Sequence, residues 1–430
     1  MTELNGSKRV SRTQWLMIGG ALLLMVGFGF LVMPKSADAL PIRVGILHSL
    51  TGPMAISEKP MVDAELLAIE EINARGGLLG RRVEAVIADG ASDWPTFAVQ
   101  AEKLINQHNV ATVFGCWTSA SRKTVKPVFE RNDHLLIYPM AYEGLEMSPN
   151  IVYTGAVPNQ QVLPALKWGL DVLGKRVFLV GSDYVWPHAI NEIMKDQLAN
   201  LGAELVGESY VFFGSTDLDD TVARIEQVAP DFIISSIAGD SNPAFYQALY
   251  RAGINAESTP VVSFSVSESE LKGMDPKFVA GHFVVWSYLQ NLPSEINAQF
   301  IQRFKAKYGA DRVTSDVIAT AYSSVMLWAQ AVEEAESAEV DQVLTALRGQ
   351  SLAAPEGIIS IDASTQHAWR SMTVGQINSR GAIDPVWQID RPIRPVPFPG
   401  SRTQVAWQEM LENMYARWDN SWSNPVERAQ

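Results

Sequence analysis

The chain has 430 residues, of which 47% are hydrophobic, 19% are charged and 12 are tryptophan. At about 150 residues per domain this predicts two to three globular domains, and the composition excludes a disordered or low-complexity chain. The formal net charge of −13 argues against nucleic acid as a partner, because phosphate backbones repel an acidic protein. A single cysteine, Cys116, excludes intrachain disulfide bonds and multi-thiolate metal sites.

The N-terminal segment carries an export signal. Residues 15–33 form an uncharged apolar run behind Lys8, Arg9 and Arg12. At about 1.5 Å per residue a helix of this length crosses a hydrocarbon core of roughly 30 Å, and the positive charges hold its start in the cytoplasm. We therefore expect the remaining chain to be periplasmic or otherwise extracytoplasmic. Residues 37–39 have the small-x-small form of a signal peptidase site, so the run is either a cleaved signal peptide or a retained membrane anchor.

From residue 42 onward short apolar runs alternate with helical patterns, which is typical of βαβ units and a parallel sheet. The first series has expected strands at 43–48, 83–88, 111–116, 135–139 and 151–154. Its expected helices are at 61–75, 95–106 and 119–130. These elements predict one α/β lobe with helices on both faces of a parallel sheet.

A second α/β series begins near Pro158. Its expected strands are at 177–181, 204–211, 232–237, 260–264 and 281–288, and its expected helices at 160–173, 187–201, 218–228 and 243–252. Further helices are expected at 294–308, 315–336 and 340–348, with two late strands at 373–377 and 385–389. Residues 404–418 place apolar side chains at helical spacing and predict an amphipathic helix docked on a lobe.

These series predict two lobes with a cleft between them. The expected domains are a signal peptide or anchor at 1–40, lobe 1 at 41–157 and 287–352, lobe 2 at 158–286 and 353–398, and a C-terminal tail with the docked helix at 399–430. In open parallel sheets the ligand lies beyond the carboxyl ends of the strands, so the loops there carry the chemistry.

The loop after the third strand places Trp117, Thr118 and Ser119 directly before a helix. The indole offers a flat apolar face and one N–H donor, and the free N–H groups of a helix N-terminus favour a carbonyl or carboxylate oxygen. Core packing for Trp117 and a plain N-cap for Ser119 are the alternatives. His48, at the end of the first strand, either lines a site or is a surface histidine in a turn.

Other strand ends carry similar groups. Tyr138 is followed by a second phenol and a carboxylate, and Tyr184 and Trp186 form an aromatic pair after a strand of the second series. Asp240 begins a helix, where it either accepts N–H donors from a ligand or caps the helix, and Glu268 follows the last strand of this lobe. Hydroxyl, carboxylate and aromatic groups therefore occur at the strand ends of both lobes.

The motifs of common enzyme classes are missing from the sequence. There is no GxGxxG after a strand, no Walker loop, no HExxH and no GxSxG, and the histidines are scattered. We therefore expect a binding protein without a metal or a cofactor, and an amidase is the least favoured alternative.

Several of these loops carry a recognisable family pattern. They read HSLTGPMAISE (48–58), FGCWTSASRK (114–123), YPMAYEG (138–144), GSDYVWP (181–187), GDSNPAFY (239–246) and SFSVSESEL (263–271). This pattern, which covers about residues 41–398, resembles the urea-binding proteins of bacterial ABC importers. The wider group is the type I periplasmic binding proteins, with the branched-chain amino acid binders and the short-chain amide sensor of amidase operons. The resemblance implies a two-lobed clamp with three crossovers that closes on one small ligand and presents it to a membrane permease.

By this resemblance eight residues line the cleft. They are Trp117, Thr118, Ser119, Tyr138, Tyr184, Trp186, Asp240 and Glu268. Urea is planar and rich in donors, and it needs carboxylate acceptors, a donor for its oxygen and aromatic faces that exclude water. An amino acid ligand would need a counter-charge, and the nearest cations, Arg122 and Lys123, lie a turn inside the helix. A branched-chain amino acid binder remains an alternative, as does an amide-sensing receptor with a regulatory partner, because the tail from 401 onward is similar to that of the amide sensor.

Overall fold

The structure, a computed structural model, describes residues 40–425 apart from the side chain of Asp390. The chain divides into two units, residues 1–40 and 41–430. The apolar run at 15–33, expected to be a signal peptide or an anchor, lies outside the described residues. Within the described range, no helix has the length and apolarity needed to cross a membrane.

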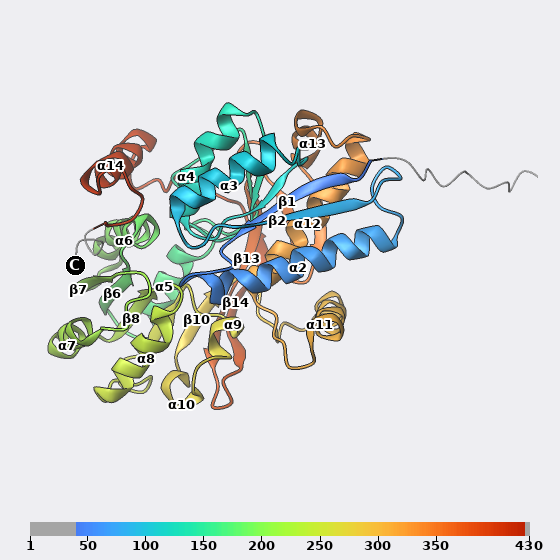
Figure 1. The fold of residues 1–430 in the computed structure, drawn as a ribbon. Coiled ribbons are helices and arrows are strands. Elements are labelled where there is room, and N and C mark those ends of the chain that lie inside the picture. Colours follow the sequence, from blue (N-terminus) through green and yellow to red (C-terminus); the bar gives the residue numbers. More distant parts are fainter. Residues whose placement is uncertain (1–39, 426–430) are drawn as a thin grey trace, which may run out of the picture. The chain divides into compact units, whose positions relative to one another are not determined.

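The first sheet has five strands, all parallel, in the order β2-β1-β3-β4-β5. Its strands are β1 (Ile42–His48), β2 (Val83–Asp89), β3 (Val113–Gly115), β4 (Leu136–Tyr138) and β5 (Ile151–Tyr153). The four helices on its two faces are α2 (Ala55–Ala74), α3 (Trp94–Asn106), α4 (Ser119–Arg131) and α12 (Asp316–Ala335). Helices α2 and α12 pack together on one face, and α3 and α4 on the other (Figure 1). This arrangement agrees with the prediction from the first series.

The second sheet is larger and mixed. Its strands are β6 (Arg176–Ser182), β7 (Glu204–Val211), β8 (Phe232–Ser236), β9 (Val261–Ser263), β10 (Phe283–Trp286), β11 (Ser351–Ala354), β12 (Gly357–Ile361), β13 (Ala368–Ile377) and β14 (Ile383–Ile393). Strands β6 to β10 pair in parallel, whereas β11 to β14 join antiparallel. The parallel strands β6 to β10 agree with the expected parallel sheet. The antiparallel strands are an addition to it, because the tight turn at 378–382 permits only antiparallel pairing of β13 with β14.

Helices also cover both faces of the second sheet. They are α5 (Val162–Val172), α6 (Val185–Leu198), α7 (Asp219–Val228) and α8 (Ser241–Arg251). Helix α5 packs against α6, and α7 against α8. The remaining helices of the two lobes are α9 (Glu268–Leu271), α10 (Pro276–Val279), α11 (Glu295–Tyr308), α13 (Val340–Leu347) and the 3-10 helix η1 (Ala199–Leu201).

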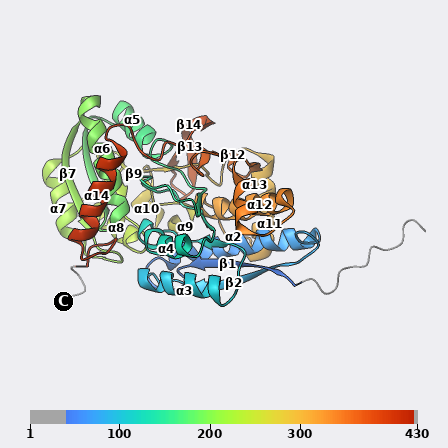
Figure 2. The same cartoon turned by 90° about the horizontal axis from the view of Figure 1, so that it is seen from above.

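The chain passes between the two sheets three times, at 154–161, 287–294 and 348–350. Seen from above, the helices of the first sheet with α11 to α13 form one body, and α5 to α8 with the second sheet form another (Figure 2). The carboxyl ends of β3 and β4 and those of β6 and β8 thus belong to different lobes. Side chains that follow these strands line the boundary between the lobes.

The tail contains the expected amphipathic helix, α14 (Gln404–Arg417), which packs against α6. Trp407, Leu411 and Met414 are its buried residues. Arg402, just before the helix, donates to Asp196 and Glu192 of α6. These contacts fix α14 to the second lobe.

Candidate ligand-binding site

The turn between β3 and α4 places the first group of site residues. Cys116 has a left-handed backbone (φ +65°), which redirects the chain so that α4 starts three residues later. Thr118 is the N-cap of α4, and its hydroxyl accepts from the backbone N–H of Ser121 at 2.9 Å. Ser119 is therefore not the N-cap, and its hydroxyl is available to other groups.

A fully buried ion cluster lies behind this turn. The Arg122 guanidinium donates to Glu143 at 2.9 Å, to Glu146 at 3.0 Å and to the Ser119 hydroxyl at 3.1 Å. Lys123 donates to Glu146 at 3.1 Å, and the Ser119 hydroxyl donates to Glu143. Burial alone would raise the pKa of Glu146, but Arg122 and Lys123 hold it well below its usual value. Two cations are thus matched by two carboxylates.

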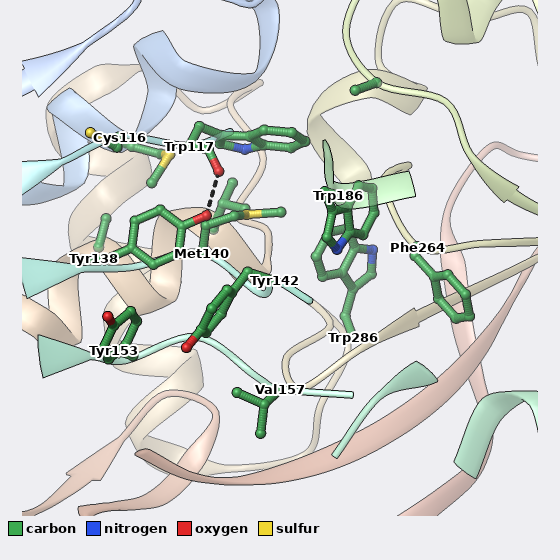
Figure 3. Close-up of a cluster of buried hydrophobic side chains, with 14 of the residues drawn as sticks. Cys116, Trp117, Tyr138, Met140, Tyr142, Tyr153, Val157, Trp186, Phe264 and Trp286 are labelled. Carbon is green, nitrogen blue, oxygen red and sulfur yellow. Dashed lines mark hydrogen bonds between the residues drawn. The ribbon is translucent and has the colours of Figure 1, made fainter. Parts of the chain in front are cut away.

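Aromatic side chains enclose the cluster. The guanidinium carbon of Arg122 lies 4.8 Å from the ring centroid of Tyr138 and 4.2 Å from that of Tyr142. The Tyr138 hydroxyl donates to the backbone carbonyl of Trp117 at 2.7 Å (Figure 3). Tyr138 therefore holds the loop that carries the indole.

The second lobe contributes Tyr184 and Trp186, which follow β6 at the start of α6 and are 1% and 2% exposed. Burial raises the pKa of Tyr184, and the neighbouring Tyr138, Glu143 and Glu58 of the first lobe raise it further. Figure 3 shows Trp186 on the opposite side of the cluster from Tyr138. The structure thus brings residues of both lobes together.

Glu58 is a site residue that the sequence analysis missed, because it was read as part of a loop. Helix α2 begins at Ala55, so Glu58 lies in its first turn and is buried. One of its oxygens, Oε2, accepts from the backbone N–H of Ser49 at 2.6 Å and lies 3.5 Å from Nδ1 of His48. Glu65, about two turns further along α2, is also buried and was not among the expected site residues. The polar loop sequence at 48–58 was the only signal for this position.

His48 is fully buried, so the interpretation as a surface histidine is wrong. Its Nε2 lies 3.0 Å from Oε1 of Glu65. Burial would lower the pKa of His48, but Glu65 and Glu58 together raise it to about 9. The imidazolium is therefore protonated at neutral pH and neutralises part of the carboxylate charge.

Four buried polar atoms of this region have no hydrogen-bond partner among residues 40–425. They are Nε1 of Trp117, Nδ1 of His48, Oε1 of Glu58 and Oε2 of Glu65. Nδ1 of His48 still has an ion-pair contact with the Glu58 carboxylate at 3.5 Å. Glu58 also interacts electrostatically with the Cys116 thiol, next to Trp117 in the chain. Buried polar groups are nearly always paired, so an unmatched donor and an unmatched acceptor in one cluster require an explanation.

Two further expected residues lie on α8 and α9. Glu268 is buried at the start of α9, where its Oε1 accepts from the backbone N–H of Gln290 at 2.6 Å and its Oε2 has no hydrogen-bond partner among residues 40–425. Burial raises its pKa to about 8, and Asp316 adds to the shift. Asp240 is exposed at the N-cap position of α8 and lines a surface depression of about 470 Å³ with Arg251. The structure therefore groups the other six expected residues, presents Asp240 to solvent, and buries Glu268 on α9, the helix that contacts α2 of the first lobe.

The two lobes are in direct contact around the cluster. The Ser57 hydroxyl of α2 donates to Glu270 of α9 at 2.7 Å. Gly239 (φ +64°) lies so near Pro53 that a Cβ on it would be 2.7 Å from the proline carbonyl oxygen. Trp117 and Ser119 are each 2% exposed. The lobes are therefore closed over the candidate site.

A family model described as "Periplasmic binding protein domain" matches residues 42–404. The chain belongs to this family. The leucine-, isoleucine-, valine-, threonine-, and alanine-binding protein of Pseudomonas aeruginosa is 24% identical over 349 residues, 78% of this chain and 88% of that protein. A limonene hydroxylase of Geobacillus stearothermophilus is 32% identical over 147 residues, which are 33% of this chain and only 27% of the hydroxylase. This short match carries no activity over to this chain.

Solved structures of other binding proteins share the two-lobed fold. A solute-binding protein of an ABC transporter from Rhodopseudomonas palustris BisB5, in complex with 3,4-dihydroxybenzoic acid, has a TM-score of 0.75 at 19% identity and covers 83% of this chain and 99% of its own. The branched-chain amino acid substrate-binding protein of Streptococcus pneumoniae, in complex with isoleucine, has a TM-score of 0.71 at 21% identity, with 80% and 99% covered. At these identities the likeness establishes the fold, and the expected two-lobed α/β architecture is confirmed.

Replacement of Arg122 tests the ion cluster. Arg122→Met leaves Glu143 and Glu146 buried with only Lys123, and we expect a loss of about 3–5 kcal/mol in the free energy of unfolding. Arg131→Met is the matched control, because Arg131 forms an exposed ion pair with Glu102 and should cost about 0–1 kcal/mol. Guanidinium unfolding monitored by circular dichroism measures both, and equal losses would contradict a structural role for the cluster.

The buried histidine predicts a pH-dependent stability. Because the pKa of His48 is raised from 6.5 to about 9 on folding, its stabilisation is complete below about pH 6.5 and is lost as the pH rises through 9. We expect His48→Gln to be less stable than the parent by up to about 3 kcal/mol at pH 6, and this difference to shrink towards pH 9.5. Thermal unfolding from pH 6 to 9.5 measures the effect. The exposed His108→Gln is the control and should show a constant difference.

Proposed function

We propose that this protein is the extracytoplasmic solute-binding component of an ABC importer, and that its closed cleft holds urea or a short-chain aliphatic amide for delivery to a permease. Membership of the periplasmic binding protein family and the solute-binding relatives support the transport role. The apolar run at 15–33, behind positive charges, supports export. In the described part of the chain no group of three or more His, Cys, Asp or Glu side chains could hold a metal ion.

The observation that carries the ligand assignment is a buried donor on Trp117 and a buried acceptor on Glu58, two of the polar atoms of this region that have no hydrogen-bond partner. Nε1 of Trp117 is a free donor and Oε1 of Glu58 a free acceptor. A primary amide or urea has one carbonyl oxygen for the former and an NH₂ group for the latter. The aromatic faces of Tyr184 and Trp186 complete an apolar enclosure for a planar molecule.

The charge balance of the cluster also favours a neutral ligand. Arg122 and Lys123 are already bound to Glu143 and Glu146, so a ligand carboxylate would find no uncommitted side-chain cation among these groups. It would also meet the carboxylate of Glu58. Because burying an unpaired charge is costly, this arrangement disfavours simple carboxylic acids.

A branched-chain amino acid is the second candidate, supported by the relatives named for leucine, isoleucine and valine. The ammonium group of such a ligand would suit Glu58, and its carboxylate would have to bind at the N–H groups of the first turn of α4. An amide-sensing receptor with a regulatory partner would use the same cleft as an importer. The two roles differ in the partner and not in the site.

In this proposal Trp117, Ser119, Tyr184, Trp186 and Glu58 contact the ligand. Thr118 and Tyr138 position the loop between β3 and α4. Asp240 and Glu268 were also expected to line the cleft. Asp240 is exposed in this structure, and Glu268 is buried on α9.

Calorimetric titration of the full chain with urea, acetamide, formamide and leucine tests the assignment. Urea has only four heavy atoms, so at about −1.5 kcal/mol per atom the expected dissociation constant is roughly tens of micromolar. Saturable binding of urea or an amide without leucine binding is the expected result. Binding of leucine alone would overturn the amide assignment in favour of the second candidate.

The role of the Trp117 donor has a matched control within the chain. Trp117→Phe keeps an aromatic ring but removes the free N–H, and we expect affinity for urea to fall about 5- to 10-fold, the value of one hydrogen bond of roughly 1 kcal/mol. Trp328→Phe removes another buried, unpartnered indole N–H in α12 and should leave affinity unchanged. Equal affinities of the two variants would show that the Trp117 N–H does not bind the ligand.

A further inference from the structure

Residues 422–424 lie directly over the residues that begin α6. The backbone N–H of Val185 donates to the carbonyl of Trp422 at 2.9 Å, and the N–H of Asn424 donates to the carbonyl of Asp183 at 3.1 Å. Between these bonds, Tyr184 and Ser423 form an antiparallel bridge. The segment 419–425, which we call the strap, therefore pairs with the stretch of backbone that carries Tyr184.

The strap also contacts the first lobe. The indole N–H of Trp94, at the start of α3, donates to the Ser423 hydroxyl at 3.0 Å. The ammonium group of Lys123 lies 5.0 Å from the ring centroid of Trp422. A depression of about 150 Å³ beside the strap is lined by residues of both lobes, among them Pro53 and Phe213. The strap thus bridges the two lobes at the edge of the cleft.

The two sets of contacts differ in strength. On the second lobe, the strap is held by backbone pairing, by the bond from the Asn424 amide to the Asp183 carboxylate at 2.7 Å, and by α14, whose Tyr415 ring packs on Trp422 with centroids 4.5 Å apart. The contacts with the first lobe that we identify are one hydrogen bond and one cation–π contact. The strap will therefore stay with the second lobe when the lobes separate, and the contacts with Trp94 and Lys123 will break.

We propose that the strap is a latch that holds the two lobes closed, so that opening of the cleft requires its release from Trp94 and Lys123. Because Lys123 also belongs to the ion cluster behind Ser119, release of the latch removes a contact from the wall of the candidate site. The latch is independent of which solute the cleft binds.

Cys116 provides a readout of opening without any ligand. It is the only cysteine of the chain and is fully buried next to Trp117, and burial raises its pKa, so its thiol is unreactive while the cleft is closed. We would measure its labelling by 5,5′-dithiobis(2-nitrobenzoate) in the full chain, in the double variant Trp422→Leu/Ser423→Ala, and in a chain that ends at Trp418 and keeps α14.

The latch predicts that both variants are labelled at least fivefold faster than the parent at an unchanged thermal unfolding midpoint. Lys167→Gln is the control, because it removes an exposed ion pair with Asp171 within α5 that involves no residue of the strap, and it should change the rate less than twofold. If the truncated chain fails to fold, the double variant still decides. Equal labelling rates for parent and double variant would overturn the proposal.

A second measurement tests whether the strap holds the lobes together or only shields the cleft from solvent. Amide hydrogen exchange at 267–271 reports on the contact between Ser57 and Glu270, which joins the lobes through α2 and α9 and not through the strap. A latch predicts faster exchange there in the double variant. Faster Cys116 labelling with unchanged exchange at 267–271 would mean that the strap only shields the cleft, and would overturn the latch. Neither readout depends on urea binding, so failure of the proposed ligand and failure of the latch are distinguishable.

Discussion

The buried ion cluster around Arg122 is the interaction on which the candidate site depends. It joins the first turns of α4 to the loop that follows β4, two segments that meet only because β3 and β4 are neighbours in the first sheet. The guanidinium orients the Ser119 hydroxyl, and Tyr138 below it holds the carbonyl of Trp117. Loss of the cluster would therefore disturb both the stability of the lobe and the geometry of the cleft wall.

The same cluster supports the proposed preference for a neutral solute, because its two cations are balanced by two carboxylates. Cations that are committed to carboxylates cannot also neutralise an acidic ligand, and extra charges in a desolvated site are costly. Solved relatives with this fold bind aromatic acids or amino acids, so the fold itself does not determine the ligand. The distinction lies in which polar atoms of the closed cleft are left without partners.

Much of the fold could be predicted from sequence because its signals are local. The alternation of apolar runs with helical patterns located the elements of both sheets and the docked tail helix. The strands β11 and β12 were missed because they are short and partly exposed, as at Ile358. The start of α2 was missed because residues 55–60 are mostly small or polar and include Pro60, so they lack the apolar spacing that marked the rest of the helix.

The candidate site was predicted less completely, because its contacts are long-range. The position of Ser119 after a strand was visible, but its partner Glu143 is 24 residues away, and His48 is paired with a carboxylate 17 residues on. Asp240 shows the converse problem. Asp240 is a carboxylate that could accept N–H donors from a ligand, and it follows a strand, but at the start of α8 it is exposed to solvent. A residue that follows a strand in the sequence can be assigned to an edge of the sheet. The sequence does not show whether its side chain points into the cleft.

The close approach of Gly239 to the carbonyl of Pro53 has a consequence for the closing motion itself. A Cβ at position 239 would lie 2.7 Å from the carbonyl oxygen of Pro53 and 3.1 Å from Sδ of Met54. Any side chain larger than that of glycine would therefore hold the lobes apart at this point, so the dimensions of the shut cleft depend on this glycine and not on the solute inside. A solute too large for that fixed volume would leave the lobes ajar, so a permease that engages only the fully shut form would reject it by shape before any chemical recognition.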